Sequence, residues 1–282
     1  MREPAMQLRQ MAVEPLRDDS EPSGQLALVV ASGKGGAGKS LVSVLLASAM
    51  ADRGLKVLLF DGSQNLGHLH VLLGVSLDRR LEHVVTGEVE PAALLVEVRP
   101  GLWLVPGDSG AEVLYALPAV DQARLHHRLS TLYRGFDVVM IDAGPGVEGA
   151  IRLATMGGTR LVVVTVPEVA ALTDAYALIK LVHAQLPSLP IDVLVNRASG
   201  PDDVEVTFQR LATAAERFLG RSLTLLGGLP ETPALREALR RPGGVLDDPA
   251  LMSFRATAAA LSQFTLTTAG ASASVAEDGP LP

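Results

Sequence analysis

Residues 33–40 hold the side chains best suited to chemistry in this chain. They read Gly-Lys-Gly-Gly-Ala-Gly-Lys-Ser and fit the phosphate-binding loop pattern G-x-x-x-x-G-K-[ST] at every fixed position. Glycines allow backbone angles that residues with a Cβ resist, so successive N–H groups can turn inward and hold phosphate oxygens. In such a loop Lys39 reaches the β- and γ-phosphates, and the Ser40 hydroxyl binds Mg²⁺. The octet therefore predicts a nucleotide site.

The loop requires a strand before it and a helix after it. Leu26–Val30 is a short apolar run typical of a buried strand, and Leu41–Asp52 lacks Gly and Pro and has apolar residues at helical spacing. The bound phosphates would then lie at a helix N-terminus, where the macrodipole favours an anion. The loop residues expected to bind the cofactor are Gly33, Lys34, Gly35, Gly36, Ala37, Gly38, Lys39, Ser40 and Leu41.

Short apolar runs alternate with helical stretches along the rest of the chain. This alternation indicates βαβ units and predicts one doubly wound, mostly parallel α/β sheet of the P-loop NTPase class. The expected strands are 26–31, 56–60, 102–105, 137–141, 161–166, 191–195 and 224–226. The expected helices are 39–53, 66–73, 91–96, 121–133, 147–156, 172–185, 203–219, 233–241 and 249–264. Thr232 followed by Pro233 is a typical helix start.

Two of the expected strands lead directly into an aspartate. Val138–Asp142 and Lys56–Asp61 are apolar runs whose last residue carries a carboxylate. A P-loop protein needs an acidic residue at a strand end to order Mg²⁺. The predicted metal ligands are therefore Ser40, Asp142 and Asp61.

Composition narrows the class of protein. The chain has 282 residues with 48 % hydrophobic content, which is enough for a sizeable core in one domain. It contains no cysteine, which excludes disulfides and thiolate sites and suits the cytoplasm. No apolar stretch reaches the ~18 residues of a membrane-spanning helix, and residues 1–10 lack a signal-peptide core. The net charge of −7 argues against non-specific DNA binding, because phosphate contacts dominate DNA affinity.

Four segments are expected along the chain. Residues 1–10 suit a short amphipathic helix, 11–25 a polar linker, 26–264 the nucleotide-binding domain and 265–282 a disordered tail. The helix expected at 249–264 has a single basic residue, Arg255, whereas interfacial helices combine an apolar face with several Lys or Arg. We expect this helix to pack on the core, and membrane binding to be weak or absent, at most peripheral at the inner face of the cell membrane.

The loop lysines Lys34 and Lys39 together resemble the deviant Walker A motif of the MinD/ParA superfamily. Other stretches resemble its FlhG branch, the flagellar number regulators also called FleN or YlxH, and the resemblance covers residues 26 to about 262. These stretches are His70–Gly74, Val105–Gly110, Pro167-Glu168, Thr173–Lys180, Val193–Arg197 and Ala215–Gly220.

This resemblance implies an ATP- and Mg²⁺-dependent homodimer in which Lys34 reaches the phosphates of the partner protomer. It implies catalytic roles for Lys34, Lys39 and Asp61, and a switch that controls flagellar number or placement through basal-body or regulatory proteins. It also places four residues near the adenine, namely Asn196, Arg197, Pro230 and Glu231.

The segment after Asp61 departs from the family pattern. The family has Asp-x-Asp-x-Gly, whereas residues 61–65 here read Asp-Gly-Ser-Gln-Asn. The second Asp is tied to orienting the attacking water, and Ser63 is a poor general base in its place. Losing such a group typically costs about 10²–10⁴-fold in rate, and Gln64 is one residue out of register. Weak or absent hydrolysis is one expectation; ordinary turnover through the family's other groups is the alternative.

The N-terminus departs as well. The family's DQAxxLR helix stimulates FlhF, an SRP-type GTPase, and residues 3–9 read Glu-Pro-Ala-Met-Gln-Leu-Arg. Pro4 replaces the glutamine, so stimulation of such a partner is in doubt, and a coincidental leader is the alternative. Two other functions stay open: a positioning ATPase of the same superfamily for another cargo, and a non-hydrolysing scaffold. Nucleotide affinity measured beside turnover would separate a scaffold from an ATPase.

Overall fold

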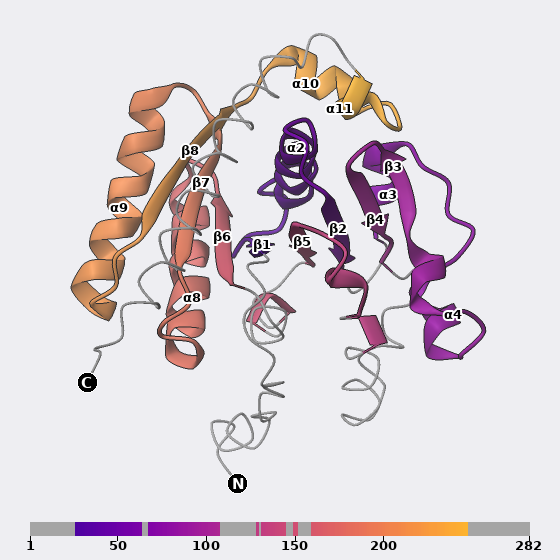
Figure 1. The fold of residues 1–282 in the computed structure, drawn as a ribbon. Helices are drawn as coiled ribbons and strands as arrows, with labels where there is room; N and C mark the ends of the chain where they lie inside the picture. The colour runs from indigo at the N-terminus through magenta and orange to yellow at the C-terminus, as the bar shows by residue number, and fades with distance from the viewer. Residues whose placement is uncertain are drawn as a thin grey trace, which may run out of the picture.

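The computed structural model describes residues 26–63, 67–107, 128–129, 131–144, 149–151 and 159–247. Within these residues one sheet contains β1 (Leu26–Ala31), β2 (Val57–Gly62), β3 (Val96–Arg99), β4 (Leu102–Val105), β5 (Val138–Ala143), β6 (Arg160–Thr165), β7 (Ile191–Ala198) and β8 (Thr224–Pro230). The strand order is β3-β4-β2-β5-β1-β6-β7-β8, and every neighbouring pair is parallel except β3 with β4 (Figure 1). The predicted fold class is confirmed.

Helices cover both faces of the sheet. They are α2 (Lys39–Ala51), α3 (Leu69–Leu73), α4 (Leu81–Val85), the 3-10 helix η1 (Pro91–Leu94), α8 (Val169–Gln185), α9 (Pro201–Leu219), α10 (Pro233–Ala238) and α11 (Gly244–Asp247). Leu28 and Val30 of β1 join a core with α2, α3, α10 and α11, whereas Val29 and Ala31 join a second core with α4, α8 and α9. Because both faces are buried, the central strands are mostly apolar, as parallel strands usually are.

The strand register brings the predicted chemistry to one edge. In a parallel sheet the carboxyl ends of all strands meet at the same edge, where such folds bind ligands. Asp142 pairs in register with Val30 on one side and with Asp61 on the other. The loop that follows β1 therefore emerges between the ends of β5 and β6, beside both aspartates.

Most expected elements are present with shifted ends. β7 and β8 extend to Ala198 and Pro230, beyond the expected 195 and 226, and the helix expected at 66–73 begins at Leu69. The helix start at Thr232 is confirmed, because its side chain accepts a hydrogen bond from Leu235 N at 3.2 Å.

The helix expected at 91–96 is wrong beyond Leu94. A 3-10 turn ends there, and residues 96–99 form the antiparallel edge strand β3. The short helices α4 and α11 are also additions to the sequence prediction. The predicted segments 1–10, 11–25, 249–264 and 265–282, most of 121–133 and 147–156, and Gln64 and Asn65 lie outside the described residues.

Candidate functional site

The phosphate-binding loop connects the end of β1 to the start of α2. Gly36 and Gly38 have φ angles of 79° and 90°, in the left-handed region where only glycine is unstrained, and Gly38 is the N-cap of α2. Lys39 is the first residue of the helix and only 9 % exposed. The free N–H groups of this helix end and the buried ammonium group of Lys39 together form a site for an anion.

Two neighbouring elements hold the loop in place. A Cβ on Gly33 would lie 2.1 Å from the backbone oxygen of Asp174 in α8, so only glycine allows the loop to pack this closely. Asn196, buried at the end of β7, donates from Nδ2 to the backbone oxygen of Ala37 at 2.8 Å. Sequence reasoning missed this bracing role of Asn196. The predicted contact of its amide with adenine stays a prediction.

The structure brings the four predicted adenine-site residues together. Asn196 and Ala198 of β7 pair in register with Leu229 and Pro230 of β8, which places the turn after β7 beside the turn after β8. Arg197 has φ 57°, the one positive value among the described non-glycine residues. Its charge contributes to the lowered pKa of Glu231, although the hydrogen bond from Arg236 at 3.0 Å is the larger cause. Strained residues of this kind cluster at ligand sites.

Asp142 is the buried acid of the site. It is 1 % exposed and accepts hydrogen bonds from Ser40 and from Ser43, the latter at 3.3 Å. Burial raises the pKa of this carboxyl from 3.8 to about 7, and the neighbouring carboxylate of Asp61 adds to the rise. The hydrogen bonds and positive charge around Asp142 therefore do not offset the cost of burying its ionised form. A cation bound beside the carboxylate would lower that cost.

Asp61 makes different contacts. Its Oδ1 accepts from Ser63 N at 3.0 Å and its Oδ2 from Leu69 N at 3.3 Å, while a Cβ on Gly67 would come within 2.5 Å of Oδ2. Both oxygens thus already have backbone donors, and the carboxylate holds Ser63 and the first residue of α3, Leu69. Direct binding of a metal by Asp61 stays a prediction.

The oxygen donors fit a hard divalent cation. Within the described residues no three His, Asp or Glu side chains converge to hold a metal ion alone. Mg²⁺ in nucleotide sites commonly uses one or two protein oxygens, water and the phosphates themselves. The Ser40 hydroxyl and the Asp142 carboxylate are hydrogen-bonded to each other beside the loop, so they match this donor set.

The second loop lysine, Lys34, differs from Lys39 in its surroundings. Its side chain is 37 % exposed and forms an ion pair with Glu168, which directly precedes α8. No sequence signal near Lys34 indicates this partner, because the two residues are 134 positions apart.

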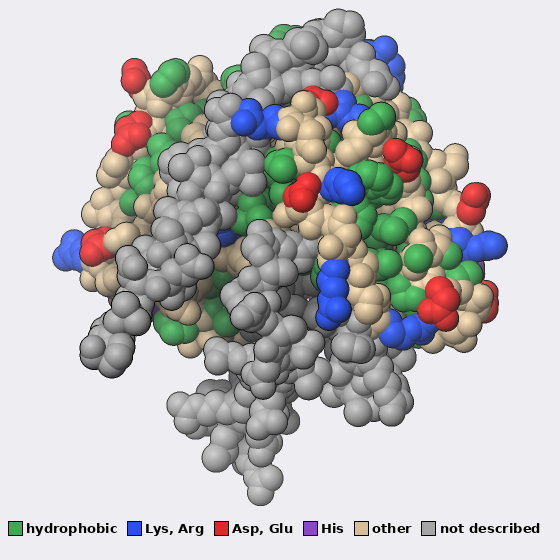
Figure 2. Space-filling model, in the orientation of Figure 1, with side chains coloured by type: hydrophobic (Ala, Val, Ile, Leu, Met, Phe, Trp, Pro, Cys, Tyr) green, Lys and Arg blue, Asp and Glu red, His purple; other side chains and the backbone are tan. Residues whose placement is uncertain are grey.

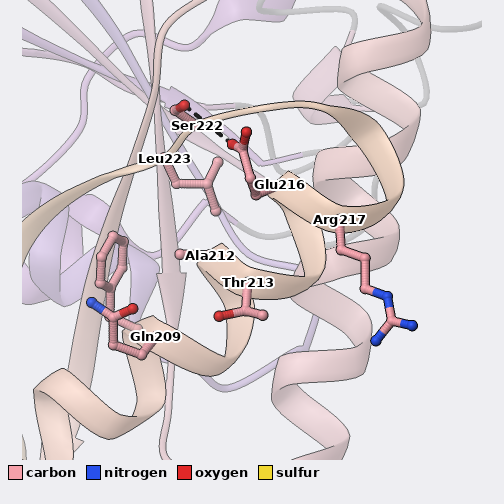
Figure 3. A pocket seen from close by; sticks show the side chains of 8 residues that line it. Gln209, Ala212, Thr213, Glu216, Arg217, Ser222 and Leu223 are labelled. Carbon is pink, nitrogen blue, oxygen red and sulfur yellow. Dashed lines mark hydrogen bonds between the residues drawn. The ribbon is translucent and has the colours of Figure 1, made fainter.

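A surface hollow of about 430 Å³ lies between α9 and the turn that precedes β8 (Figure 3). Phe208, Ala212 and Leu223 give it apolar walls, and Glu216 and Ser222 are linked at its rim by a 3.2 Å hydrogen bond. It contains none of the predicted site residues and no loop that would hold a phosphate.

Comparison with known proteins agrees with this geometry. The CobQ/CobB/MinD/ParA nucleotide binding domain matches residues 28–242. Antiactivator FleN of Pseudomonas aeruginosa is 31 % identical over 243 residues, which cover 85 % of this chain and 87 % of FleN. Flagellum site-determining protein YlxH of Helicobacter pylori is 30 % identical over 214 residues, which cover 76 % of this chain and 72 % of YlxH. The crystal structure of the Pyrococcus furiosus cell division ATPase MinD has a TM-score of 0.68 at 27 % identity, covering 86 % of this chain and 98 % of MinD. The chain belongs to the MinD/ParA family of nucleotide-binding proteins, in company with FleN and YlxH.

Proposed function

We propose that the chain is an ATP- and Mg²⁺-dependent homodimerisation switch that regulates the number or placement of flagella. The observation that carries the dimer is the contrast between the two loop lysines. Lys39 is buried in the phosphate cradle, whereas Lys34 lies at the surface of the same loop with 37 % of its side chain exposed. A lysine in that position is accessible to a nucleotide held by a second protomer.

Each residue of the site has a defined task in this proposal. The loop amides and Lys39 bind the phosphates, and Ser40 and Asp142 hold Mg²⁺, which when bound neutralises charge on the phosphate oxygens. Asp61 keeps Ser63 and the start of α3 in position. Asn196 braces the loop at Ala37, and the ends of β7 and β8, at Arg197 and Pro230, flank the expected adenine position.

The flagellar role is supported by the relatives. YlxH is a flagellum site-determining protein by name, FleN is an antiactivator, and both match this chain over more than two thirds of their own length. We infer that the partners are flagellar basal-body or regulatory proteins, with an FlhF-like GTPase as a further candidate. The cytoplasm is the proposed location, with at most peripheral membrane contact. None of the helices in the described ranges has the length and apolar character needed to cross a bilayer.

Acidic and basic side chains are interspersed over the described part of the face drawn in Figure 2. Together with the net charge of −7, this distribution supports the expectation that the protein does not bind DNA non-specifically.

A second candidate function is a scaffold that binds ATP without turning it over. The observation in its favour is Ser63, whose backbone is fixed against Asp61 at the position where the family carries a carboxylate. A hydroxyl there offers no strong base for water, so hydrolysis is expected to be weak in a switch and absent in a scaffold.

The proposal is tested at two levels. Sedimentation velocity of the purified chain with Mg²⁺ and ATP should show a dimer that is absent without nucleotide and absent in Lys34→Ala. Electron microscopy of a strain lacking the gene should show extra, missing or misplaced flagella. A chain that stays monomeric with ATP would overturn the switch, and unchanged filaments would remove the flagellar role.

A further inference from the structure

Lys34 is held by a carboxylate of its own chain. Its ammonium group donates a hydrogen bond to Oε2 of Glu168, and the two side chains form an ion pair. Glu168 follows β6, which pairs with β1 in the sheet, so the loop after β1 and the turn after β6 are neighbours. The close packing of Gly33 on Asp174 fixes this approach. The pair is therefore a consequence of how the loop packs against α8.

Glu168 uses its carboxylate for this contact and not for capping. It occupies the N-cap position of α8, yet its side chain makes no capping hydrogen bond. Side chains at this position usually accept from a free backbone N–H of the first helical turn. Here the Lys34 hydrogen bond, then the Lys34 charge, and to a smaller extent Arg197, lower the pKa of Glu168.

We propose that Glu168 is a positioning residue that latches Lys34 within its own protomer, and that dimer formation breaks this pair. The inference rests on the proposed function, in which Lys34 reaches the phosphates of the partner protomer. In the proposed dimer the Lys34 side chain turns away from Glu168 to reach across the interface, so the two states compete. Glu168 thereby sets the protein and ATP concentrations at which the dimer forms.

The exposure of the pair suits a latch that opens. Lys34 and Glu168 are 37 % and 54 % exposed, and exposed pairs of this kind typically change an equilibrium by up to about fivefold. Because a symmetric dimer releases two latches, the expected change in its dissociation constant is up to about 25-fold. Arg160 and Asp192 offer the contrast: they are 6 % and 0 % exposed, and a pair so deeply buried would cost too much to open.

Glu168→Gln is the test variant, since it keeps the size of the side chain and removes its charge. Glu237→Gln is the control, because Glu237 of α10 also forms a surface ion pair, with Arg240 at 3.2 Å, and this pair is 61 % and 78 % exposed. Sedimentation in Mg²⁺ and a non-hydrolysable ATP analogue should give a dimer dissociation constant several-fold lower for Glu168→Gln and unchanged for Glu237→Gln. A value for Glu168→Gln within twofold of wild type, or higher, would overturn the latch.

A second readout needs neither nucleotide nor dimer. Acetylation of lysine amines, followed by mass spectrometry, should modify Lys34 several-fold faster in Glu168→Gln than in wild type. The exposed Lys180 of α8 serves as the internal reference and should not change. An unchanged Lys34 rate overturns the latch alone. A wild-type chain that fails to dimerise with ATP overturns the proposed function instead, so the two failures are distinguishable.

Discussion

Without nucleotide and at alkaline pH, the Asp142→Asn variant should be more stable than wild type. Once Mg²⁺ and nucleotide are added, it should be less stable than wild type. The cause is the buried carboxyl, whose pKa rises from 3.8 to about 7 on folding. The folded chain keeps this proton to a higher pH than the unfolded chain does. The free energy of unfolding of the wild type therefore falls as the pH rises from about 4 to about 7, and stays low above that pH.

The size of the effect follows from the structure. A pKa change from 3.8 to about 7 corresponds to about 4 kcal/mol at pH 8. Asparagine removes this cost but weakens the hydrogen bonds from Ser40 and Ser43, at about 1 kcal/mol each. The expected net gain is about 2 kcal/mol at pH 8, or about 4–8 °C in Tm for a domain of this size. At pH 5 the wild-type carboxyl is protonated, and the two proteins should unfold at similar temperatures.

Thermal unfolding at pH 5 and pH 8, with and without Mg²⁺ and ATP, checks this reasoning. Ligand binding to the folded state stabilises the wild type by mass action, and Asp142→Asn should lose that gain. Asp137→Asn is the control, because Asp137 is an exposed residue just before β5 that accepts from Lys56 N at 2.8 Å. A nucleotide-free Asp142→Asn protein less stable than wild type at pH 8 would refute the argument, since it would mean that Lys39 fully compensates the ionised carboxylate.

Three further substitutions probe hydrolysis, loop packing and the buried ion pair. Ser63→Asp should raise ATP turnover, measured as phosphate release, by about 10²-fold or more, because it restores a group that orients water. An unchanged rate of phosphate release would show that Ser63 does not limit hydrolysis. Gly33→Ala should lower the free energy of unfolding by about 1–3 kcal/mol, because its Cβ would lie 2.1 Å from a backbone oxygen. Gly35→Ala should not lower it, because the space around Gly35 is open. Equal effects of the two substitutions in urea denaturation would contradict the packing argument. Arg160→Ala should lower the free energy of unfolding by about 3–5 kcal/mol, because it leaves Asp192 buried without a partner. The Arg240 side chain is 78 % exposed, so Arg240→Ala should lower the free energy of unfolding by about 1 kcal/mol or less in the same denaturation series.

Local patterns account for the parts of the site that the sequence predicted. The glycine spacing specifies the loop, and apolar runs ending in Asp61 and Asp142 place both carboxylates at one sheet edge. Strand β3 was missed because Val96–Arg99 is short, half polar and preceded by a helical turn. Its strand state depends on pairing with β4, which is a tertiary contact.

Contacts between distant residues set the limit of sequence reasoning. Asn196 reaches the backbone of Ala37 across 159 positions, and Lys34 meets Glu168 across 134. Neither contact leaves a local signal, because each depends on β1 lying beside β6 and on β7 ending near the loop. The sequence could indicate that Asn196 and Lys34 matter, but the structure was needed to identify what each contacts before nucleotide binds.

The charges at the sheet edge explain why metal and nucleotide should act together. Asp142 and Asp61 are 1 % and 2 % exposed, and the ammonium group beside them is that of Lys39. Phosphates alone would add negative charge next to two buried carboxylates, whereas a divalent cation alone would find few protein ligands among the described residues. Bound together, the cation would compensate Asp142 and the phosphates would supply the further oxygens that it needs. We therefore expect the wild-type site to favour the Mg²⁺–nucleotide pair over either component. For that reason the stability order of wild type and Asp142→Asn should reverse only when both are present.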